Sequence, residues 1–580
     1  MRWSIKPADE NLVRRLGDQA GVDPLVGRLL VLRGVNDADG AARFLNPSLQ
    51  HLNSPYLMLG MKTAVERLQA AIANREKVLI YGDYDVDGTT AIVILKTAIE
   101  LCGGTAGFHV PHRIREGYGM RDEVIERAAA DGVRLIISVD TGIRAFAAAE
   151  TARRVGVDLI VTDHHLPEVG QGVPGALAVL NPNQPGCGYP CKELCGAGVA
   201  FKIVQALLEE SGRARLLPSF LKMVAIATVA DAVDLVGENR VIARLGLDGL
   251  RHAVNPGLKA LIAVSALDSG HAINSGDVAF RLAPRINAAG RMDVAQDVIE
   301  LFSTRDEVRA RELAEHLDQL NAERQAEEQR IMEEIQQRLE SDAALRDRYC
   351  MVIDGDGWHR GVIGICATRV VERTGRPALV IARDGDEAHG SGRSIAAFHL
   401  LNALESCAGL FTRFGGHAHA AGFALPSEHV SELCEALDRY ARARLTLADF
   451  EPALDIDAEL GLEQVNPDLC ARLEQLRPFG MGNPEPVFAA RGVRLGLPPK
   501  VLKEKHLRLR VVQECRAGRQ AFDAMGWRMV ERTEKDPLVA GDVLDIAFTV
   551  EKNSNPEFGG IRLTLRDYVM AKAVGRGGSP

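Results

Sequence analysis

Short apolar runs alternate with helix-like segments in the first third of the chain. Segments 89–101 and 122–130 have the length and composition of helices, and four runs of strand-forming residues lie around them. These runs are Lys77–Tyr81, Phe108–Val110, Leu135–Val139 and Leu159–Thr162. Continuous apolar strands separated by helices are typical of a parallel sheet covered on both faces. We therefore predict an α/β domain here, with a further buried helix over Leu221–Ala230.

The pattern changes twice after residue 300. Residues 304–341 are rich in Glu, Arg and Gln, with Leu and Ile at helical spacing, which predicts one long helix with a single packed stripe. A second α/β pattern begins at Tyr349, with apolar runs at Cys350–Ile353 and Ala378–Ile381. After about residue 452 apolar and polar residues alternate, as in Val543–Val550, which favours the short strands of a barrel. The predicted fold is thus two α/β lobes joined by a long helix, followed by a small C-terminal β-barrel.

These changes of pattern also set the predicted domain limits. A chain of 580 residues has room for about three or four domains, since domains run to roughly 100–200 residues. In chain order the limits are 1–50, a partly helical lead-in; 51–275, the first α/β domain; 276–345, a linker with the long helix; 346–450, the second α/β domain; 451–572, the barrel; and 573–580, a flexible tail.

Composition and charge are those of an ordinary globular protein. Hydrophobic residues make up 46% and charged residues 25% of the chain. The net charge of −9 gives no overall attraction to nucleic acid, so binding a polyanion requires local basic patches or bound cations. No apolar run approaches the roughly 18 residues needed to span a bilayer. The start, Met1–Pro7, also lacks the apolar core of a signal peptide, so we predict no membrane association and a cytoplasmic location.

Ten cysteines are scattered along the chain, which predicts reduced thiols and no disulfide framework. Cys187, Cys191 and Cys195 do form a cluster. Their three-residue gaps differ from the usual two-residue zinc spacing, and no fourth ligand is evident nearby. We interpret the cluster as coincidental.

Acidic and imidazole side chains follow the ends of the predicted strands. They are Asp83, Asp85 and Asp87 after the first strand, Asp140 after the third, and Asp163, His164 and His165 after the fourth. Ligands bind beyond the carboxyl ends of parallel strands, so we expect these side chains on one rim. Asp231 follows the predicted buried helix. Each Asp alone is better explained as a helix cap or turn former, but together they predict a site for two divalent metals.

The residue types indicate which metals these are. Carboxylates with one imidazole suit Mn²⁺ and Mg²⁺, whereas a thiolate-rich set would indicate zinc. Asp85 and Asp87 are two apart in a glycine-terminated turn, so both carboxylates can face one cavity, and Asp140 is the natural bridging ligand. Two ions about 3.5–4 Å apart can activate water and stabilise the leaving oxygen in phosphoryl transfer.

The same motifs resemble those of the DHH phosphoesterase superfamily, which is named for elements of the Asp163-His164-His165 type. Gly415–Gly422 resembles the glycine–histidine motif of the associated second domain. Trp358–Gly364 and Arg477–Pro486 resemble one branch of the superfamily, the exonucleases specific for single-stranded DNA. The match runs in the expected order from about residue 50 to 570. It implies a DHH domain, a DHHA1-like substrate-binding domain and an OB-like nucleic-acid-binding domain for the three predicted domains.

The resemblance also implies an activity and its residues. The activity is 5′-to-3′ hydrolysis of single-stranded DNA to nucleoside 5′-monophosphates, with two Mn²⁺ or Mg²⁺ ions, in DNA repair and recombination. The implied metal ligands are Asp85, Asp87, Asp140, His164 and Asp231. Asp83 is implied as a further essential carboxylate, and His165 as a residue that orients the site or contacts the scissile phosphate. Phosphatase relatives have a His ligand where this chain has Tyr81, so the resemblance does not extend to that ligand.

A second set of residues is implied to contact substrate. Arg113, Ser391 and Arg393 resemble the 5′-phosphate pocket, and Arg with a hydroxyl on glycine-rich loops suits phosphate oxygens. His417 and His419 are expected to contact the substrate backbone. Further candidates are Arg281, Arg285 and Arg291, and in the barrel Lys500, Lys503, Lys505, Arg508 and Arg510. Single-stranded DNA is thus the predicted partner, and the resemblance adds a helicase and a single-strand-binding protein.

Two alternatives remain open at this point. The first is another hydrolase of the same superfamily: an oligoribonuclease, a pyrophosphatase or a cyclic-dinucleotide phosphodiesterase. Those relatives resemble only the two-domain core, so the barrel favours the exonuclease. The second is a non-catalytic scaffold at replication forks, which the complete set of competent ligand residues disfavours.

Overall fold

The computed structural model describes residues 2–113, 116–117, 119–168, 170–268, 272–292, 295–515, 518–535, 537–552 and 560–571. The chain forms two compact units. The larger unit comprises Leu52–Val233 and Ile242–Glu451, and the smaller one comprises Met1–His51, Asp234–Val241 and Pro452–Pro580. The predicted tail, residues 573–580, lies outside the described residues.

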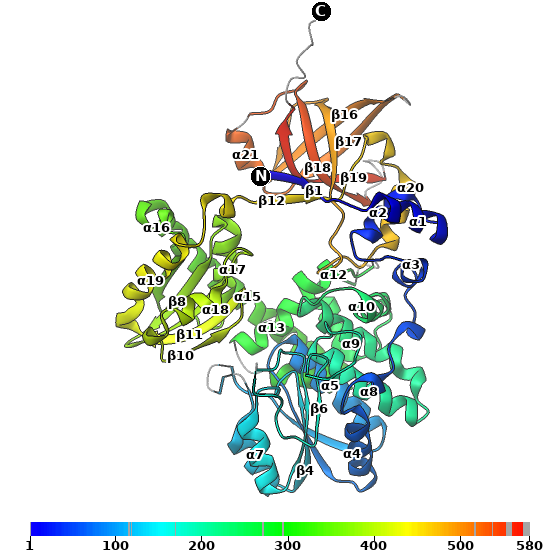
Figure 1. Cartoon of the computed structure of the whole chain (residues 1–580), viewed down its shortest axis with the longest axis vertical. Coiled ribbons are helices and arrows are strands. Elements are labelled where there is room, and N and C mark those ends of the chain that lie inside the picture. Colours follow the sequence, from blue (N-terminus) through cyan, green and yellow to red (C-terminus); the bar gives the residue numbers. More distant parts are fainter. Residues whose placement is uncertain are drawn as a thin grey trace, which may run out of the picture. The chain divides into compact units, whose positions relative to one another are not determined.

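The first sheet of the larger unit has five parallel strands (Figure 1). In spatial order they are β3 (Thr105–His109), β2 (Lys77–Tyr81), β4 (Val133–Val139), β5 (Asp158–Thr162) and β6 (Ala178–Leu180). Residues of opposite pleats enter two apolar clusters: Leu135 and Ile137 on one side, Ile136 on the other. The first side packs on helices α4 (Met61–Ala73), α5 (Val86–Leu101) and α8 (Gly196–Glu210), and the second on α6 (Asp122–Ala130) and α7 (Phe146–Val155). The predicted parallel sheet, buried on both faces, is confirmed.

Two predicted boundaries in this domain are wrong by a few residues. The helix expected from Thr89 begins at Val86, because the carboxylate of Asp85 caps it by accepting a hydrogen bond from the Gly88 N–H at 3.0 Å. The strand expected at Phe108–Val110 is Thr105–His109. That strand lies at the sheet edge and is partly exposed, so it lacks the continuous apolar run of a central strand.

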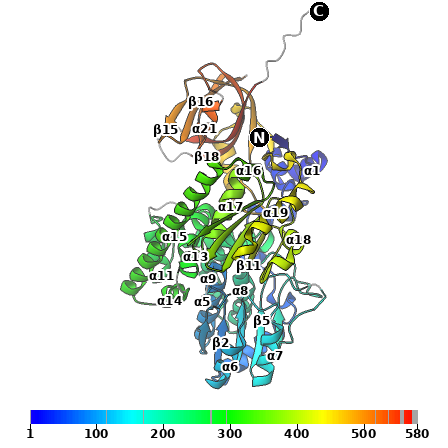
Figure 2. The same ribbon diagram turned by 90° about the vertical axis from the view of Figure 1, so that its left-hand side faces the viewer.

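One long helix belongs to both cores of the larger unit. It follows a group of shorter helices, α9 (Leu217–Ala230), α10 (Gly237–Leu250), α11 (Pro256–Val264), α13 (Ala283–Met292) and α14 (Gln296–Ser303). This long helix, α15, spans Glu307–Ser341 and packs beside α17 (Ile363–Thr374) (Figure 2). Its Leu313 and Leu317 are buried in the core of the first sheet, whereas Ile331 and Ile335 are buried with the second sheet. The predicted connecting helix is confirmed.

The second sheet is mixed. In spatial order it contains β10 (Arg413–Gly416), β11 (Ala420–Pro426), β9 (Glu387–Arg393), β8 (Ala378–Asp384) and β7 (Met351–Asp356). Strands β7 and β8 are parallel, and the other neighbours are antiparallel. Helices α18 (Leu400–Glu405) and α19 (Val430–Arg442) contribute to the core on one face, and α17 to the core on the other. Strand β9 carries Ser391 and Arg393 close to α17.

The smaller unit is built on a β-barrel. Its strands are ordered β13 (Ala458–Glu459), β14 (Phe488–Leu495), β18 (Val543–Lys552), β19 (Ile561–Met570), β17 (Gly518–Gly526), β16 (His506–Cys515) and β15 (Lys500–Leu502). Strand β14 also pairs with β16, which closes the sheet on itself. The predicted barrel is confirmed.

The N-terminal residues belong to this barrel unit, which nothing in the sequence pattern indicated. Strand β1 (Arg2–Ile5) pairs in parallel with β12 (Ala453–Ile456). Helices α1 (Glu10–Ala20), α2 (Pro24–Val31) and α3 (Ala38–Leu45) place Leu16, Leu29 and Phe44 in the barrel core, together with α20 (Pro467–Gln475). No helix in the described segments combines the length and apolarity needed to cross a bilayer.

Candidate metal centre

The predicted site residues meet at the carboxyl end of the first sheet. Asp83 lies two residues beyond β2, Asp140 directly follows β4, and Asp163 directly follows β5. Asp85 caps helix α5 and Asp87 lies in its first turn, so the expected glycine-terminated turn is instead a helix start. Asp231 is the C-cap of α9. The buried α9 helix therefore carries Asp231 to the rim that the parallel strands form.

Ligand atoms of these residues lie close enough to share metal ions. Three groups have their ligand atoms within 4.8 Å of one another: Asp83, Asp85 and Asp140; Asp87, His164 and Asp231; and Asp140, His164 and His165. His164 Nε2 lies 3.3 Å from Asp140 Oδ1, 3.8 Å from Asp231 Oδ2 and 3.9 Å from Asp87 Oδ2. Asp140 is common to the acidic group and to one of the histidine groups.

The start of helix α8 holds two of these carboxylates. The backbone N–H groups of Gly196 and Ala197 donate hydrogen bonds to Asp87 Oδ2 and Oδ1, at 2.5 and 2.8 Å. Asp140 adopts a left-handed backbone with φ of 58° and packs against Gly196, where a Cβ would lie 2.4 Å from Asp140 Oδ1. Glycine is therefore required at position 196. Sequence reasoning missed it, because α8 lies more than 50 residues from Asp140 in the chain.

Asp163 organises the loop that carries both histidines. Its Oδ1 accepts hydrogen bonds from the backbone N–H groups of His164 and His165, at 2.8 and 3.1 Å, and lies 2.7 Å from His165 Nδ1. Its Oδ2 accepts one from the Ile143 N–H at 2.9 Å. Burial alone would raise the pKa of Asp163, but these bonds, first among them that from His165, lower it. Asp163 therefore orients His165 and is itself saturated with hydrogen bonds.

Electrostatics show that the ligand carboxylates repel one another. Burial, and then repulsion from Asp87 and Asp85, raises the pKa of Asp231 to about 9 and that of Asp140 well above its usual range. The pKa of Asp83 is also raised, by burial and then by Asp85. Asp83 Oδ1 and Asp231 Oδ2 are buried and have no hydrogen-bond partner among the described residues. Divalent cations that prefer oxygen ligands fit this donor set, because they relieve the repulsion and coordinate carboxylate oxygens.

A cluster of arginines lies in the same unit. It contains Arg113, Arg291 and Arg393. Burial, and then the charge of Arg113, lowers the pKa of Arg393. Burial, and then the charges of Arg113, Arg324 and Arg393, lowers the pKa of Arg291 to about 10. Arg113 stacks on the Tyr84 ring at 5.0 Å, next to Asp83 and Asp85 in the chain. Arg393 Nη1 lies 3.1 Å from Ser391 Oγ. The cluster therefore adjoins the segment that carries the acidic residues.

Helix α17 begins against this cluster. A Cβ on Gly364 would lie 3.0 Å from Ser391 Oγ and 3.2 Å from Arg393 Nη2, so glycine lets both side chains approach the first turn. Arg291 Nη1 donates to the Gly361 carbonyl at 2.9 Å. Two guanidinium groups, a hydroxyl and a helix N-terminus thus surround one small region, which is suited to a phosphate.

The other predicted substrate residues differ in their surroundings. Burial, and then the charges of His419, Arg393 and His165, lowers the pKa of His417. The His417 and His419 rings are 6.2 Å apart. Arg281 instead bonds to backbone carbonyls of Ser265 and Ala266, and Arg285 pairs with Asp318.

The barrel holds a further candidate that sequence reasoning overlooked. Arg508 and Arg510 both pair with Asp523, so the carboxylate offsets part of the positive charge that these two arginines add to the barrel surface. Trp527 is 49% exposed, with a T-shaped contact to His506 at 4.9 Å. An exposed tryptophan after an alternating strand is the signal that could have identified it.

The cysteine cluster gives no sign of a metal site. Cys195 is the buried N-cap of α8, and Cys187 and Cys191 are half-buried and belong to no disulfide. Within the described segments, the groups able to hold a metal contain no cysteine.

Comparison with known proteins first gives the class. Family models match in the order predicted: the DHH family N-terminal domain at residues 77–228, the DHHA1 domain at 347–443 and the RecJ OB domain at 456–567. Two α/β lobes with an acidic rim thus define a DHH-type phosphoesterase carrying an OB domain.

Individual relatives narrow this class. The chain is 38% identical over 506 residues to the single-stranded-DNA-specific exonuclease RecJ of Dickeya dadantii, covering 84% of this chain and 86% of that protein. It is 41% identical over 488 residues to RecJ of Bacillus subtilis, where the match covers 84% of this chain but 61% of the longer relative. A crystal structure of RecJ from Thermus thermophilus in complex with Mn²⁺ matches with a TM-score of 0.83 at 27% identity, covering 100% of this chain and 81% of that one. The chain belongs to the RecJ family of single-stranded-DNA-specific exonucleases.

Proposed function

We propose that this protein is a 5′-to-3′ exonuclease that hydrolyses single-stranded DNA to nucleoside 5′-monophosphates with two Mn²⁺ or Mg²⁺ ions, in DNA repair and recombination. One observation carries the proposal: a buried acidic centre and a half-buried arginine cluster lie in one compact unit, where Arg113 of the cluster stacks on Tyr84, the residue between Asp83 and Asp85. The first suits metal ions and the second suits a terminal phosphate.

In this proposal the metal ligands are Asp85, Asp87, Asp140, His164 and Asp231, with Asp140 as the bridge. When bound, two divalent ions would supply activation of a water and charge neutralisation at the scissile phosphate. Asp83 accompanies Asp85 and Asp140 in the acidic group and serves as a further carboxylate. His165, oriented by Asp163, contacts a phosphate oxygen of the bond to be cleaved.

Polarity comes from the arginine cluster. Arg113, Ser391 and Arg393 hold the 5′-phosphate of the strand, with Arg291 adding charge from α13. His417 and His419 contact the backbone between that phosphate and the metal centre. A strand that enters with its 3′ end first presents no terminal phosphate on this side, so the cluster favours degradation from the 5′ end.

The barrel supplies the grip on the rest of the strand. Lys503 and Glu504, both at positive φ, form the tight turn between β15 and β16, which presents exposed Lys503 and Lys505 near the start of β16. Trp527 lies at the end of the neighbouring strand, its ring fixed by the edge contact with His506 and by Arg562 at 6.0 Å. An exposed indole beside flexible lysines can stack on any base while the lysines follow the phosphates.

The predicted domain limits remain part of this proposal. So does a cytoplasmic location, because the chromosomal DNA that needs repair lies in the cytoplasm. A helicase that supplies single strands and a single-strand-binding protein that covers them are the partners such an enzyme needs.

A time course on single-stranded DNA with a 5′-phosphate tests the proposal. The DNA is labelled at either end and incubated with Mn²⁺ or with chelator. We expect immediate mononucleotide release from the 5′ label, a shrinking ladder from the 3′ label, and no reaction in chelator. Immediate release from the 3′ label would refute the polarity, and turnover of dinucleotides or pyrophosphate alone would favour another DHH hydrolase. A strand that is bound but never cut would favour a scaffold.

A further inference from the structure

The chain passes from Asp231 directly into the barrel unit. Residues Asp234–Val241 belong to the smaller unit, and only Ala232 and Val233 separate them from Asp231. Ala232 has a left-handed backbone with φ of 57°, which makes this connection a tight turn. The carboxylate of Asp231 is thus followed, after this one turn, by a segment that packs with the smaller unit.

The segment Asp234–Val241 is held by the loop Arg477–Pro486. The proposed exonuclease activity gives this sequence motif no role. The Leu235 N–H donates to the Met481 carbonyl at 2.8 Å, and the Leu235 side chain is 1% exposed. A Cβ on Gly480 would lie 2.6 Å from Leu235 Cδ1, and one on Gly482 would lie 2.9 Å from Asp234 Cβ. Gly482 also has a positive φ of 66°. Both glycines allow the loop to lie directly on the segment that follows Asp231.

Arg240 attaches the same segment from its other end. Arg240 is 1% exposed, and its guanidinium donates to four carbonyls: Phe44 at 2.7 Å, Leu476 at 2.9 Å, Gln475 at 3.1 Å and Arg477 at 2.9 Å. Three of these carbonyls are at the C-terminal end of α20, where a cation is favoured. The guanidinium also stacks on the Phe44 ring at 3.7 Å. One side chain thus joins the segment to α3, α20 and the loop.

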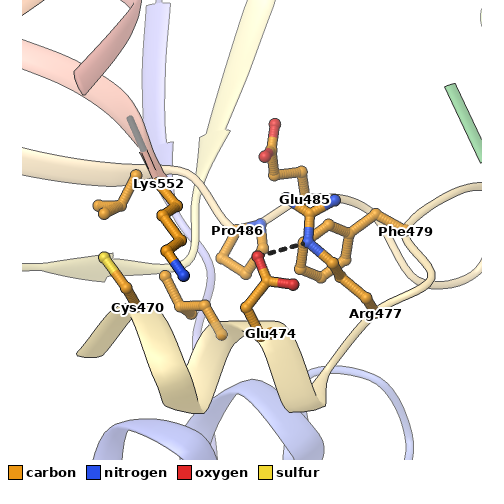
Figure 3. A pocket seen from close by; sticks show the side chains of 9 residues that line it. Cys470, Glu474, Arg477, Phe479, Glu485, Pro486 and Lys552 are labelled. Carbon is orange, nitrogen blue, oxygen red and sulfur yellow. Dashed lines mark hydrogen bonds and ion pairs between the residues drawn. The ribbon is translucent and has the colours of Figure 1, made fainter. Parts of the chain in front are cut away.

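The loop itself is rigidly built. Asn483 is fully buried and donates to the carbonyls of Leu476 and Pro478, at 2.8 and 2.7 Å. Arg33 bonds to the Asn483 side chain and to the Pro484 carbonyl. On the outer side Arg477 pairs with Glu474 of α20 at 2.9 Å and stacks on Phe479, as Figure 3 shows. The loop therefore provides a fixed support against which the segment is held.

We propose that the 477–486 loop and Arg240 are a positioning element for the metal centre: they hold the chain beyond Asp231 and so fix its carboxylate for metal binding. The inference rests on the proposed role of Asp231 as a ligand. It gives the barrel unit a second task besides contact with DNA. A change that loosens this loop or removes Arg240 leaves all the metal-ligand side chains present. It lowers the affinity for metal because the Asp231 carboxylate is held less firmly.

The test measures Mn²⁺ binding to the full chain directly, by the loss of the free Mn²⁺ signal in electron paramagnetic resonance. Arg240→Met removes all four hydrogen bonds while keeping an apolar stem. We expect about 10-fold weaker Mn²⁺ binding, the lower end of the range for residues that orient ligands. At saturating Mn²⁺ the kcat on single-stranded DNA returns to within about 2-fold of the parent. Arg244→Met is the matched control, one turn further along α10, where Arg244 pairs with exposed Asp248; it should change neither quantity.

Gly482→Ala provides a second variant that leaves Arg240 intact. Its Cβ presses on Asp234, so Mn²⁺ affinity should fall in the same direction by a smaller factor. Unfolding midpoints in chelator show whether each variant is folded. Parent-like Mn²⁺ affinity in folded Arg240→Met and Gly482→Ala would overturn the inference, as would a kcat that excess Mn²⁺ does not restore. If the parent binds Mn²⁺ but cuts no DNA, the proposed function fails. The Mn²⁺ titrations of the variants would still decide whether the loop and Arg240 position the metal centre.

Discussion

The acidic centre and the arginine cluster are opposite in charge but alike in construction. Both gather like charges in buried or half-buried positions: Asp83, Asp140 and Asp231 in one, Arg291 and Arg393 in the other. In both, burial is the first cause of a pKa shift toward the neutral form, and like neighbours add to it. The difference lies in the expected counter-charge, which is a metal cation in the first and a phosphate in the second. One unit can thus bind two oppositely charged ligands, because a cation relieves the repulsion among the carboxylates and an anion relieves that among the guanidinium groups.

Removing the bridging carboxylate should break the acidic side of the comparison most severely. Asp140→Ala is expected to lower cleavage of single-stranded DNA by about 10³-fold or more, because both metal positions lose a ligand. DNA binding in chelator should remain close to that of the parent. Gel-based product analysis and a filter-binding assay measure the two quantities. Asp131→Ala, at an exposed site after α6, is the control, and near-normal turnover by Asp140→Ala would refute the bridging role.

A smaller change tests how tightly the acidic centre is packed. Gly196→Ala is expected to cost about 100-fold in Mn²⁺ affinity, the upper end for groups that orient metal ligands, because the new Cβ would displace Asp140. Gly198→Ala, two residues along the same helix, would meet Leu194 at 3.2 Å and should be tolerated. Isothermal titration with Mn²⁺ compares them. Equal affinities for the two variants would contradict the assigned contact.

The arginine side can be broken without touching the metal ligands. Arg393→Gln should lower the preference for a 5′-phosphorylated over a 5′-hydroxyl strand by about 10- to 100-fold, since a charge-assisted hydrogen bond contributes about 1.5–3 kcal/mol. Mn²⁺ affinity should be unchanged. Steady-state kinetics on the paired substrates give the ratio. Arg285→Gln is the control, and a preference retained by Arg393→Gln would place the phosphate elsewhere.

Stacking of a DNA base on Trp527 is an uncharged contact that lies outside the acidic centre and the arginine cluster, and its loss should have the smallest effect. Trp527→Ala should weaken binding of single-stranded DNA about 10-fold, as expected for the loss of one stacked base. Among the three tryptophans, Trp358 is 3% exposed and Trp3 donates to Asp567, so Trp527 should dominate quenching of fluorescence by an oligonucleotide. Trp527→Phe is expected to lose the quenching but keep most of the affinity. Undiminished quenching in that variant would exclude stacking at Trp527.

The sequence predicted the parts of the site that follow from local chain geometry. Asp83, Asp140 and Asp163 each end a strand of one parallel sheet, so their neighbourhood follows from strand direction alone. Asp231 could be placed at the end of a buried helix because it follows the apolar run Leu221–Ala230, but strand direction does not bring it to the rim. Gly196 could not be predicted, because its need arises from contact with Asp140 across the fold. Nor could the pairing of β1 with β12, which joins residues about 450 positions apart and has no local signal.

The sharing of α15 between two cores has a consequence for stability. The helix buries Leu313 and Leu317 with one sheet and Ile331 and Ile335 with the other, so neither lobe completes its apolar packing without it. Melting either lobe would expose half of the helix and weaken the remainder, since helices of this kind depend on tertiary packing. The DHH and DHHA1 domains should therefore unfold as one cooperative block, and a protease should find no early cleavage site between residues 307 and 341.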